Sequence, residues 1–175
     1  MGEVLPFTPV KFFMGVLAKA TFNRDELLFH LQERYGEIET ISQEINFTFS
    51  DYYDAEMGGS PVRFFVVFQD LIDPQELARV KLESNAIEDY FSLEGKRRVN
   101  LDPGILTAAN LILATTKNRS HRIPLERGIY GEVTLLYSAK KYNSFPWTYP
   151  DYNSKEVKEF FLEVRQGYLK ELKQN

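Results

Sequence analysis

The sequence predicts a single α+β domain, residues 1–175, in which helices pack on an antiparallel sheet. Hydrophobic residues make up 43% of the chain and aromatic residues 14%, enough to bury a substantial core. Short apolar runs alternate with segments of helical periodicity in the order β-α-β-β-α-β, which is a ferredoxin-like plan. A C-terminal hairpin, a further strand and a C-terminal helix extend this core.

The first half of the predicted core begins with a strand over residues 11–18. This apolar run is too short to favour a helix and is therefore expected to be buried on both faces. Asn23 can cap the helix that follows, and Gly36 can end it. The alternating residues 38–47 indicate one long, bulged strand, and residues 63–68 indicate a central strand.

The second half of the core begins with the strongest helix signal in the chain. Asp73 is a suitable cap and Pro74 suits the first helical position. Residues 97–101 then form a short strand. The Asp-Pro-Gly sequence at 102–104 is expected to stop that strand and turn the chain, with a brief helix over 106–109.

The C-terminal part is predicted to add a hairpin, a strand and a helix. Residues 111–116 and 121–125 form the hairpin, and Pro124 places its second strand at an edge of the sheet. A strand at 132–137 follows, and the last helix is expected to begin near Asn153.

Composition excludes several classes of function. The chain has no cysteine, which excludes disulfides, thiolate nucleophiles and cysteine-ligated zinc. Its two histidines, His30 and His121, are not at helical i, i+4 spacing for a metal site. The net charge of −4 provides no global attraction to nucleic acid or anionic lipid.

The N-terminal sequence favours a cytoplasmic protein. Glu3 stands where a secretory signal would carry positive charge, and no apolar run approaches the ~18 residues that a membrane span needs. We therefore expect no membrane partner. The sequence identifies no cofactor and leaves the oligomeric state open.

A dense acidic segment lies at residues 51–59, between two predicted strands. It combines three carboxylates with two tyrosines, and such a group can bind a divalent cation or act as acid and base. The alternative is a solvated hairpin tip. Tyr53 and Glu56 are the candidate site residues in this segment.

The NLDPG sequence at residues 100–104 contributes Asn100 and Asp102. Side chains at the end of a strand often project into a ligand cleft. The alternative is that Asp102 caps the brief helix that we expect after it.

A cationic cluster follows, with Lys117, Arg119, His121 and Arg122 at the predicted hairpin tip. Guanidinium and imidazole groups there can meet phosphate or carboxylate oxygens. Glu132 can pair with Arg122. The alternative is a charged tip that protects the sheet edge from pairing with other chains.

The sequence FPWTYPDY at residues 145–152 is stiff and extended because two prolines restrict its backbone. Trp147, Tyr149 and Asp151 in this segment can form the wall of a ligand site. The segment can equally clamp the last helix onto the rest of the protein.

Nucleotide and nucleic-acid motifs are incomplete. No P-loop or G-x-G-x-x-G sequence occurs, and residues 116–119 lack the aspartate that guanine recognition requires. Residues 12–17 and 65–68 resemble RNA-recognition strand motifs, but Phe64 occupies a small-residue position and the chain is acidic. RNA binding is therefore only a third hypothesis.

Five segments together resemble a bacterial family catalogued as domain of unknown function 4416. They are residues 52–58, 100–104, 114–122, 128–133 and 145–152. Some similar proteins carry a GTP-binding label, which the missing nucleotide motifs do not support. The resemblance implies that the polar and aromatic segments described above define the family, while its activity is uncharacterised.

If these segments meet at one end of the sheet, they form a polar and aromatic pocket. The predicted ligand-binding residues are Tyr53, Glu56, Asn100, Asp102, Lys117, His121, Arg122, Trp147, Tyr149 and Asp151. We expect a small anionic ligand, such as a phosphate or nucleotide. His121 and Arg122 would hold its anion, and Trp147 and Tyr149 would stack on a planar group.

The sequence also offers candidates for catalysis and for metal binding. Asp102, His121 and Glu132 are the candidate catalytic residues, and Glu56, Asp102 and Asp151 are the candidate metal ligands. The alternative function is a protein-interaction or structural module in which the aromatic segment and a sheet edge contact another protein.

Overall fold

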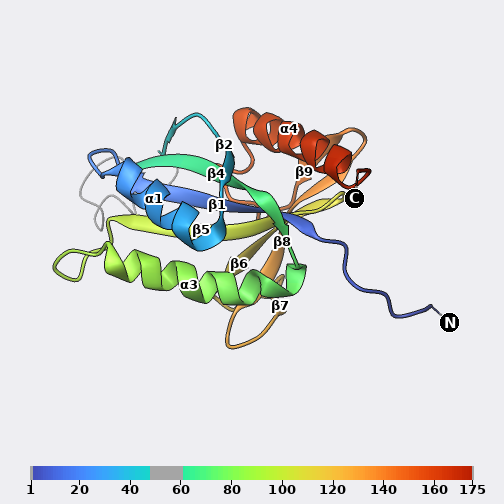
Figure 1. Ribbon diagram of the computed structural model, residues 1–175, viewed down its shortest axis with the longest axis horizontal. Coiled ribbons are helices and arrows are strands. Elements are labelled where there is room, and N and C mark those ends of the chain that lie inside the picture. The colour runs from blue at the N-terminus through green and yellow to red at the C-terminus, as the bar shows by residue number, and fades with distance from the viewer. Residues whose placement is uncertain (1, 48–60, 175) are drawn as a thin grey trace.

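The computed structural model describes residues 2–47 and 61–174, which form a nine-stranded sheet with three α-helices (Figure 1). All strand pairs described are antiparallel, which confirms the α+β class. The strands are β1 (Val10–Lys19), β2 (Ile38–Ile41), β3 (Ile45–Asn46), β4 (Pro61–Ile72), β5 (Val99–Leu106), β6 (Asn110–Thr115), β7 (Ile123–Pro124), β8 (Tyr130–Ser138) and β9 (Lys141–Ser144). Their order is β2-β4-β1-β5-β6-β8-β7, with β3 paired to β4 and β9 paired to β8.

The helices are α1 (Arg24–Tyr35), α3 (Leu77–Tyr90) and α4 (Lys155–Glu171), and a 3-10 turn η1 (Pro74–Glu76) precedes α3. Asn23 caps α1 by accepting a hydrogen bond from the Glu26 backbone, and Gly36 ends the helix at φ 91°, as predicted. Asp73 caps η1. Ser154, one residue after the expected Asn153, caps α4.

The helices cover opposite faces of the sheet. Phe12, Met14 and Val16 of β1 pack in one apolar cluster with side chains of α1 and α3. Phe13 packs in a second cluster with α4, including Phe161. The first strand is therefore buried on both faces, as its apolar run predicts.

Residues 38–47 do not form one strand, contrary to our prediction. They form β2 and β3, each paired with β4. Between them, Ser42 exchanges backbone and side-chain hydrogen bonds with Phe65. The side chain thereby replaces part of the regular ladder, so the strand is interrupted.

Residues 102–104 also differ from prediction, because they form neither a turn nor the start of a helix. They lie inside β5, which pairs with β1 from Val99 to Leu106. On its other side β5 pairs with β6 only over Gly104–Leu106. Pro103 has no N–H to donate, and β5 and β6 separate from this point.

The predicted hairpin of residues 111–116 and 121–125 is wrong as well. β6 pairs with β5 and β8, whereas β7 pairs with β8. The local turn signal at 117–120 did not reveal that a later strand lies between them. Pro124 does lie at the sheet edge, as predicted.

Within the described part of the chain, no helix has the length and apolar character needed to span a membrane.

Candidate functional site

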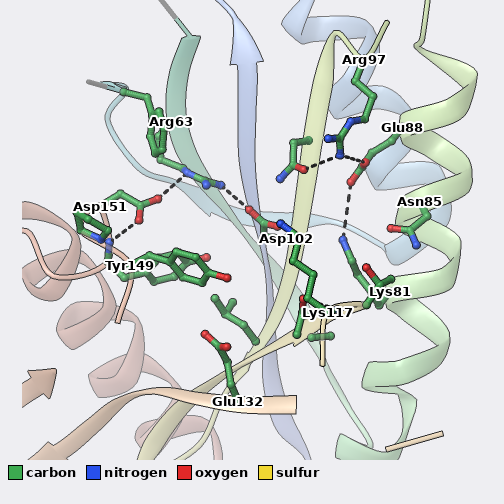
Figure 2. Close-up of a pocket in the computed structure, with 18 residues that line it drawn as sticks. Arg63, Lys81, Asn85, Glu88, Arg97, Asp102, Lys117, Glu132, Tyr149 and Asp151 are labelled. Atoms are coloured by element: carbon green, nitrogen blue, oxygen red, sulfur yellow. Dashed lines mark hydrogen bonds and ion pairs between the residues drawn. The ribbon is translucent and has the colours of Figure 1, made fainter. Parts of the chain in front are cut away.

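A cavity of about 360 Å³ opens beside the point where β5 and β6 stop pairing. Residues of α3 line one side of it, and residues 149–152 line the other (Figure 2). Because α3 and α4 cover opposite faces of the sheet, the cavity reaches both faces through the gap between the two strands.

Strand register explains which side chains meet on the α4 face. Gly15 of β1 pairs with Asp102 of β5, two residues from the Phe13–Gly104 pair. Gly104 pairs with Leu113, which pairs in turn with Glu132 of β8. Side chains alternate along a strand, so Asp102 and Glu132 project from the same face of the sheet.

Arg63 of β4 lies at the centre of the first charged group. Its Nη1 donates a 3.0 Å hydrogen bond to Oδ2 of Asp102, and its Nε lies 2.9 Å from Oδ2 of Asp151. Burial acts to lower the pKa of Arg63, but Asp151 and Asp102 together raise it above its usual range. Burial similarly acts to raise the pKa of Asp102, and Arg63 and Lys81 outweigh it, so that the pKa is lowered.

The α3 side of the cavity carries a second charged group. Nζ of Lys81 donates to the Leu101 carbonyl at 2.7 Å and lies 3.8 Å from Glu88. Glu88 accepts from the Leu101 backbone at 2.8 Å and lies 3.4 Å from Arg97. Burial raises the pKa of Glu88, and Lys81 partly opposes the shift.

Glu132 carries the third group. Its Oε2 accepts a 2.6 Å hydrogen bond from Nε of Arg122 and lies 3.2 Å from Nε2 of His121. Arg122 also donates to the Lys117 carbonyl and to the hydroxyl of Tyr149, each at 2.9 Å. The guanidinium of Arg122 therefore holds Glu132 and Tyr149 in place.

Two oxygen atoms at the cavity have neither a hydrogen-bond partner nor an ion-pair partner among the described residues. They are Oε1 of Glu132 and the hydroxyl of Tyr152, both buried. Buried polar atoms are nearly always paired, so unpaired ones at a cavity point to a missing partner. Burial raises the pKa of Tyr152, so its hydroxyl keeps its proton and can donate.

Trp147 lies outside the lining of this cavity. Its ring stacks on His121 and on Phe145, with ring centroids 4.9 Å and 4.8 Å away. Its Nε1 donates to the Val133 carbonyl at 3.0 Å. The aromatic segment thus uses its tryptophan to attach to β8.

The structure brings most of the predicted site residues together. Those that line the cavity are Asn100, Asp102, Lys117, Glu132, Tyr149 and Asp151. His121 and Arg122 support Glu132 from behind and do not line the cavity. Tyr53 and Glu56 lie outside the described residues.

A metal site is not evident in the described ranges. Residues 2–47 and 61–174 contain no group of three or more His, Cys, Asp or Glu that could hold a metal ion. Asp102 and Asp151 face the guanidinium of Arg63 instead.

Sequence reasoning missed the residues on β4 and α3 that line the cavity. Arg63 lies within an apolar strand, and a charge in such a run was a usable signal. Lys81, Ser84 and Glu88 lie on one buried stripe of α3. Their i, i+3, i+7 spacing shows that a polar stripe of this helix faces the interior.

Comparison with known proteins identifies the family of this chain. A family model described as "Domain of unknown function (DUF4416)" matches residues 8–168, in agreement with the motif resemblance. No curated protein and no solved structure matches the chain.

Proposed function

We propose that this chain, which belongs to the DUF4416 family, binds a small anionic ligand in the cavity between β5 and β6. The proposal rests on one observation, namely that the buried ammonium of Lys81 has more N–H donors than acceptors. Lys81 is buried, yet Leu101 O is the only acceptor within hydrogen-bond distance of its Nζ in the part of the chain that the structure describes. A buried ammonium has three N–H donors, so an anionic oxygen in the cavity would satisfy the remainder.

The carboxylate of Glu88 does not take that role. It lies 3.8 Å from Nζ of Lys81 and already accepts from the Leu101 backbone. Arg97 lies beside it at 3.4 Å. The nearest acid is thus engaged by other donors, which leaves Lys81 available to a ligand.

The size of the cavity favours a small molecule. At about 360 Å³ it is near the lower end of the ~300–1,000 Å³ typical of small-molecule sites. Charged side chains from β4, α3, β5 and β8 line it, which suits a phosphate- or carboxylate-bearing compound better than a purely apolar one (Figure 2).

Thermal-shift measurement with phosphate- and carboxylate-bearing compounds tests the proposal. A ligand that binds only the folded protein raises its melting temperature. We expect Lys81→Met to abolish the shift because it removes the charge and keeps a similar volume. Lys155→Met is the matched control, since the side chain of Lys155 is 80% exposed on α4 and does not line the cavity.

The outcome that contradicts the proposal is a folded Lys81→Met protein that keeps the full shift. Circular dichroism establishes whether the variant is folded. The absence of any shift with the wild-type protein across both classes of anion contradicts it as well.

A second candidate function is protein interaction at the β7 edge. Ile123 is 66% exposed and Trp147 is 36% exposed on this side of β8. Sedimentation velocity over a concentration series tests self-association through this edge. Ile123→Asp should abolish any concentration dependence, and none in the wild type would remove self-association as a role.

Two finer features belong with the proposal. We infer a ferredoxin-like core for residues 10–106, supported by the strand order β5-β1-β4-β2 and by α1 and α3 lying on one face.

A cytoplasmic location is supported by the absence of cysteine from the sequence, and cell fractionation tests it. RNA binding has less support, because Phe13 and Phe65 are buried against α4.

A further inference from the structure

The cavity is lined by equal numbers of positively and negatively charged residues. This balance indicates which charges its ligand carries, in addition to the anionic group proposed above. Its ionisable lining residues, other than tyrosines, are Arg63, Lys81, Arg97 and Lys117 against Glu88, Asp102, Glu132 and Asp151. A ligand with only negative charge would approach four carboxylates as well as four cations. A ligand with charges of both signs can match both sets.

Glu132 provides the clearest acceptor for a positive group. It is buried on β8, and its Oε2 is already occupied by Arg122 at 2.6 Å. Its Oε1 has no partner among the described residues, and the carboxylate points into the cavity (Figure 2). A buried carboxylate oxygen without a donor is costly, so a ligand donor here would gain a charge-assisted hydrogen bond.

Asp102 adds a second carboxylate on the same face. Its Oδ2 accepts from Arg63, and its side chain remains 29% exposed where it borders the cavity. Arg63 and Lys81 keep the pKa of Asp102 low despite burial, so the group is ionised near neutral pH. The α4 side of the cavity therefore presents two carboxylates, from β5 and β8.

The anion-binding group lies on the other side. Lys81 belongs to α3, and the gap between β5 and β6 connects its ammonium to the α4 face. The two ends of the cavity thus differ in the charge that they leave unsatisfied. One end lacks an acceptor for Lys81, and the other lacks a donor for Glu132.

We propose that the ligand is a small amino-substituted anion, whose ammonium group is held by Oε1 of Glu132 while its phosphate or carboxylate is held by Lys81. This inference rests on the proposed function, and it adds the chemical class of the ligand. Asp102 supports the ammonium from the neighbouring strand. Arg122 and His121 are positioning residues, because they contact Glu132 and not the cavity.

Calorimetric titration with matched probes tests the inference. The first series is aminoethyl phosphate, hydroxyethyl phosphate and ethyl phosphate, and the second is γ-aminobutyrate, γ-hydroxybutyrate and butyrate. Members of a series differ only at the terminal group. In at least one series we expect the amino compound to bind at least about tenfold more tightly than the other two, as for one charge-assisted hydrogen bond.

Variants assign that preference to Glu132. Glu132→Gln should bring the affinity for the amino compound down to that of the unsubstituted anion, and should change the latter by no more than about twofold. Glu163→Gln, at an exposed position of α4, is the matched control and should keep the preference. If Glu132→Gln does not fold, Asp102→Asn should reduce the same preference.

The possible failures are distinguishable. If anions bind but the amino compound has no advantage in either series, the inference is wrong while the proposed function stands. Equal affinity for the hydroxyl compound would also overturn it, since any donor would then suffice. If no member of either series binds, the proposed function fails together with the inference.

Discussion

Two buried cations, each flanked by two carboxylates, lie on the neighbouring strands β1 and β4. Lys11 of β1 contacts Glu39 and Glu171, and Arg63 of β4 contacts Asp102 and Asp151. Pairing places them at opposite ends of the two strands, because Lys11 is opposite Leu71 and Arg63 is opposite Leu17. The compositions are alike, but the surroundings differ.

The ammonium of Lys11 is saturated with hydrogen bonds. It has three N–H donors and three acceptors, namely Glu39, Glu171 and the Gln69 carbonyl, at 2.8, 2.9 and 3.0 Å. These contacts tie the end of α4 to the sheet. The Arg63 group borders a cavity and has the unpaired hydroxyl of Tyr152 beside it. Saturation of hydrogen bonds, more than burial or charge, separates a structural group from a candidate site.

The largest effect is expected from Arg63→Met. It leaves Asp102 and the fully buried Asp151 without their cation, and breaking such a pair lowers the free energy of unfolding by about 3–5 kcal/mol. Urea unfolding at neutral pH measures the loss. Arg79→Met is the control, since this exposed residue pairs with Glu76 and Glu83 on the surface and should change stability by no more than about 1 kcal/mol. A loss below 1 kcal/mol for Arg63→Met would show that the group is not needed for stability.

Lys11→Met should have a smaller effect, about 2 kcal/mol, although Lys11 is the more deeply buried cation. Its partners Glu39 and Glu171 are 33% and 35% exposed, so water solvates the carboxylates that remain. Urea unfolding gives the change, and titration of the variant tests its independence from the cavity. Weakened ligand binding in this variant would contradict the distinction between the two groups, because it would show that the Lys11 group also contributes to binding in the cavity.

Two tyrosine variants compare a hydroxyl that has a hydrogen-bond partner with one that has none, and only the first variant should destabilise the protein. The hydroxyl of Tyr168 donates to the Pro9 carbonyl at 2.7 Å, so Tyr168→Phe should destabilise by about 1 kcal/mol. The hydroxyl of Tyr152 is buried and unpaired, so Tyr152→Phe should be neutral or stabilise the empty protein by up to about 1 kcal/mol. Both residues are buried, so the two variants can be compared directly. The midpoints of urea unfolding, each measured against the wild type, give the two changes in stability. Equal destabilisation by both changes would contradict the distinction.

The smallest effect concerns the pH dependence of Asp102. Its pKa in the folded protein is lowered, so its contribution to stability is complete above the unfolded carboxyl pKa near 4. That contribution is lost as the pH falls through the lower folded value. Asp102→Asn should therefore flatten the stability profile below about pH 4 and leave its shape above pH 5 unchanged. A profile that differs from wild type mainly near pH 7 would contradict this assignment.

Local signals in the sequence were sufficient to predict where helices begin and end. Asn23, Gly36 and Asp73 act within their own turn of chain, where the cap and its acceptor or donor are only a few residues apart. The fully apolar run of the first strand likewise predicted burial on both faces. The family could also be predicted, because its motifs are read along the chain.

Pairing between distant strands was not predictable in the same way. The sequence around Asp102 has the residues of a turn, but its pairing with β1 keeps it extended. His121 and Arg122 have the residues of an anion site, yet Glu132 and the Lys117 carbonyl use their donors. In each case a partner far along the chain decides between two local possibilities.

The sequence by itself thus determined the class of the fold, the caps, the buried first strand and the family. Tertiary structure alone decided that Arg63 and Lys81 border the cavity, because they are brought there by strand register and by the polar stripe of α3. It also decided which polar groups remain unpaired. Hydrogen-bond saturation depends on every neighbour in three dimensions, and spacing along the chain does not specify those neighbours.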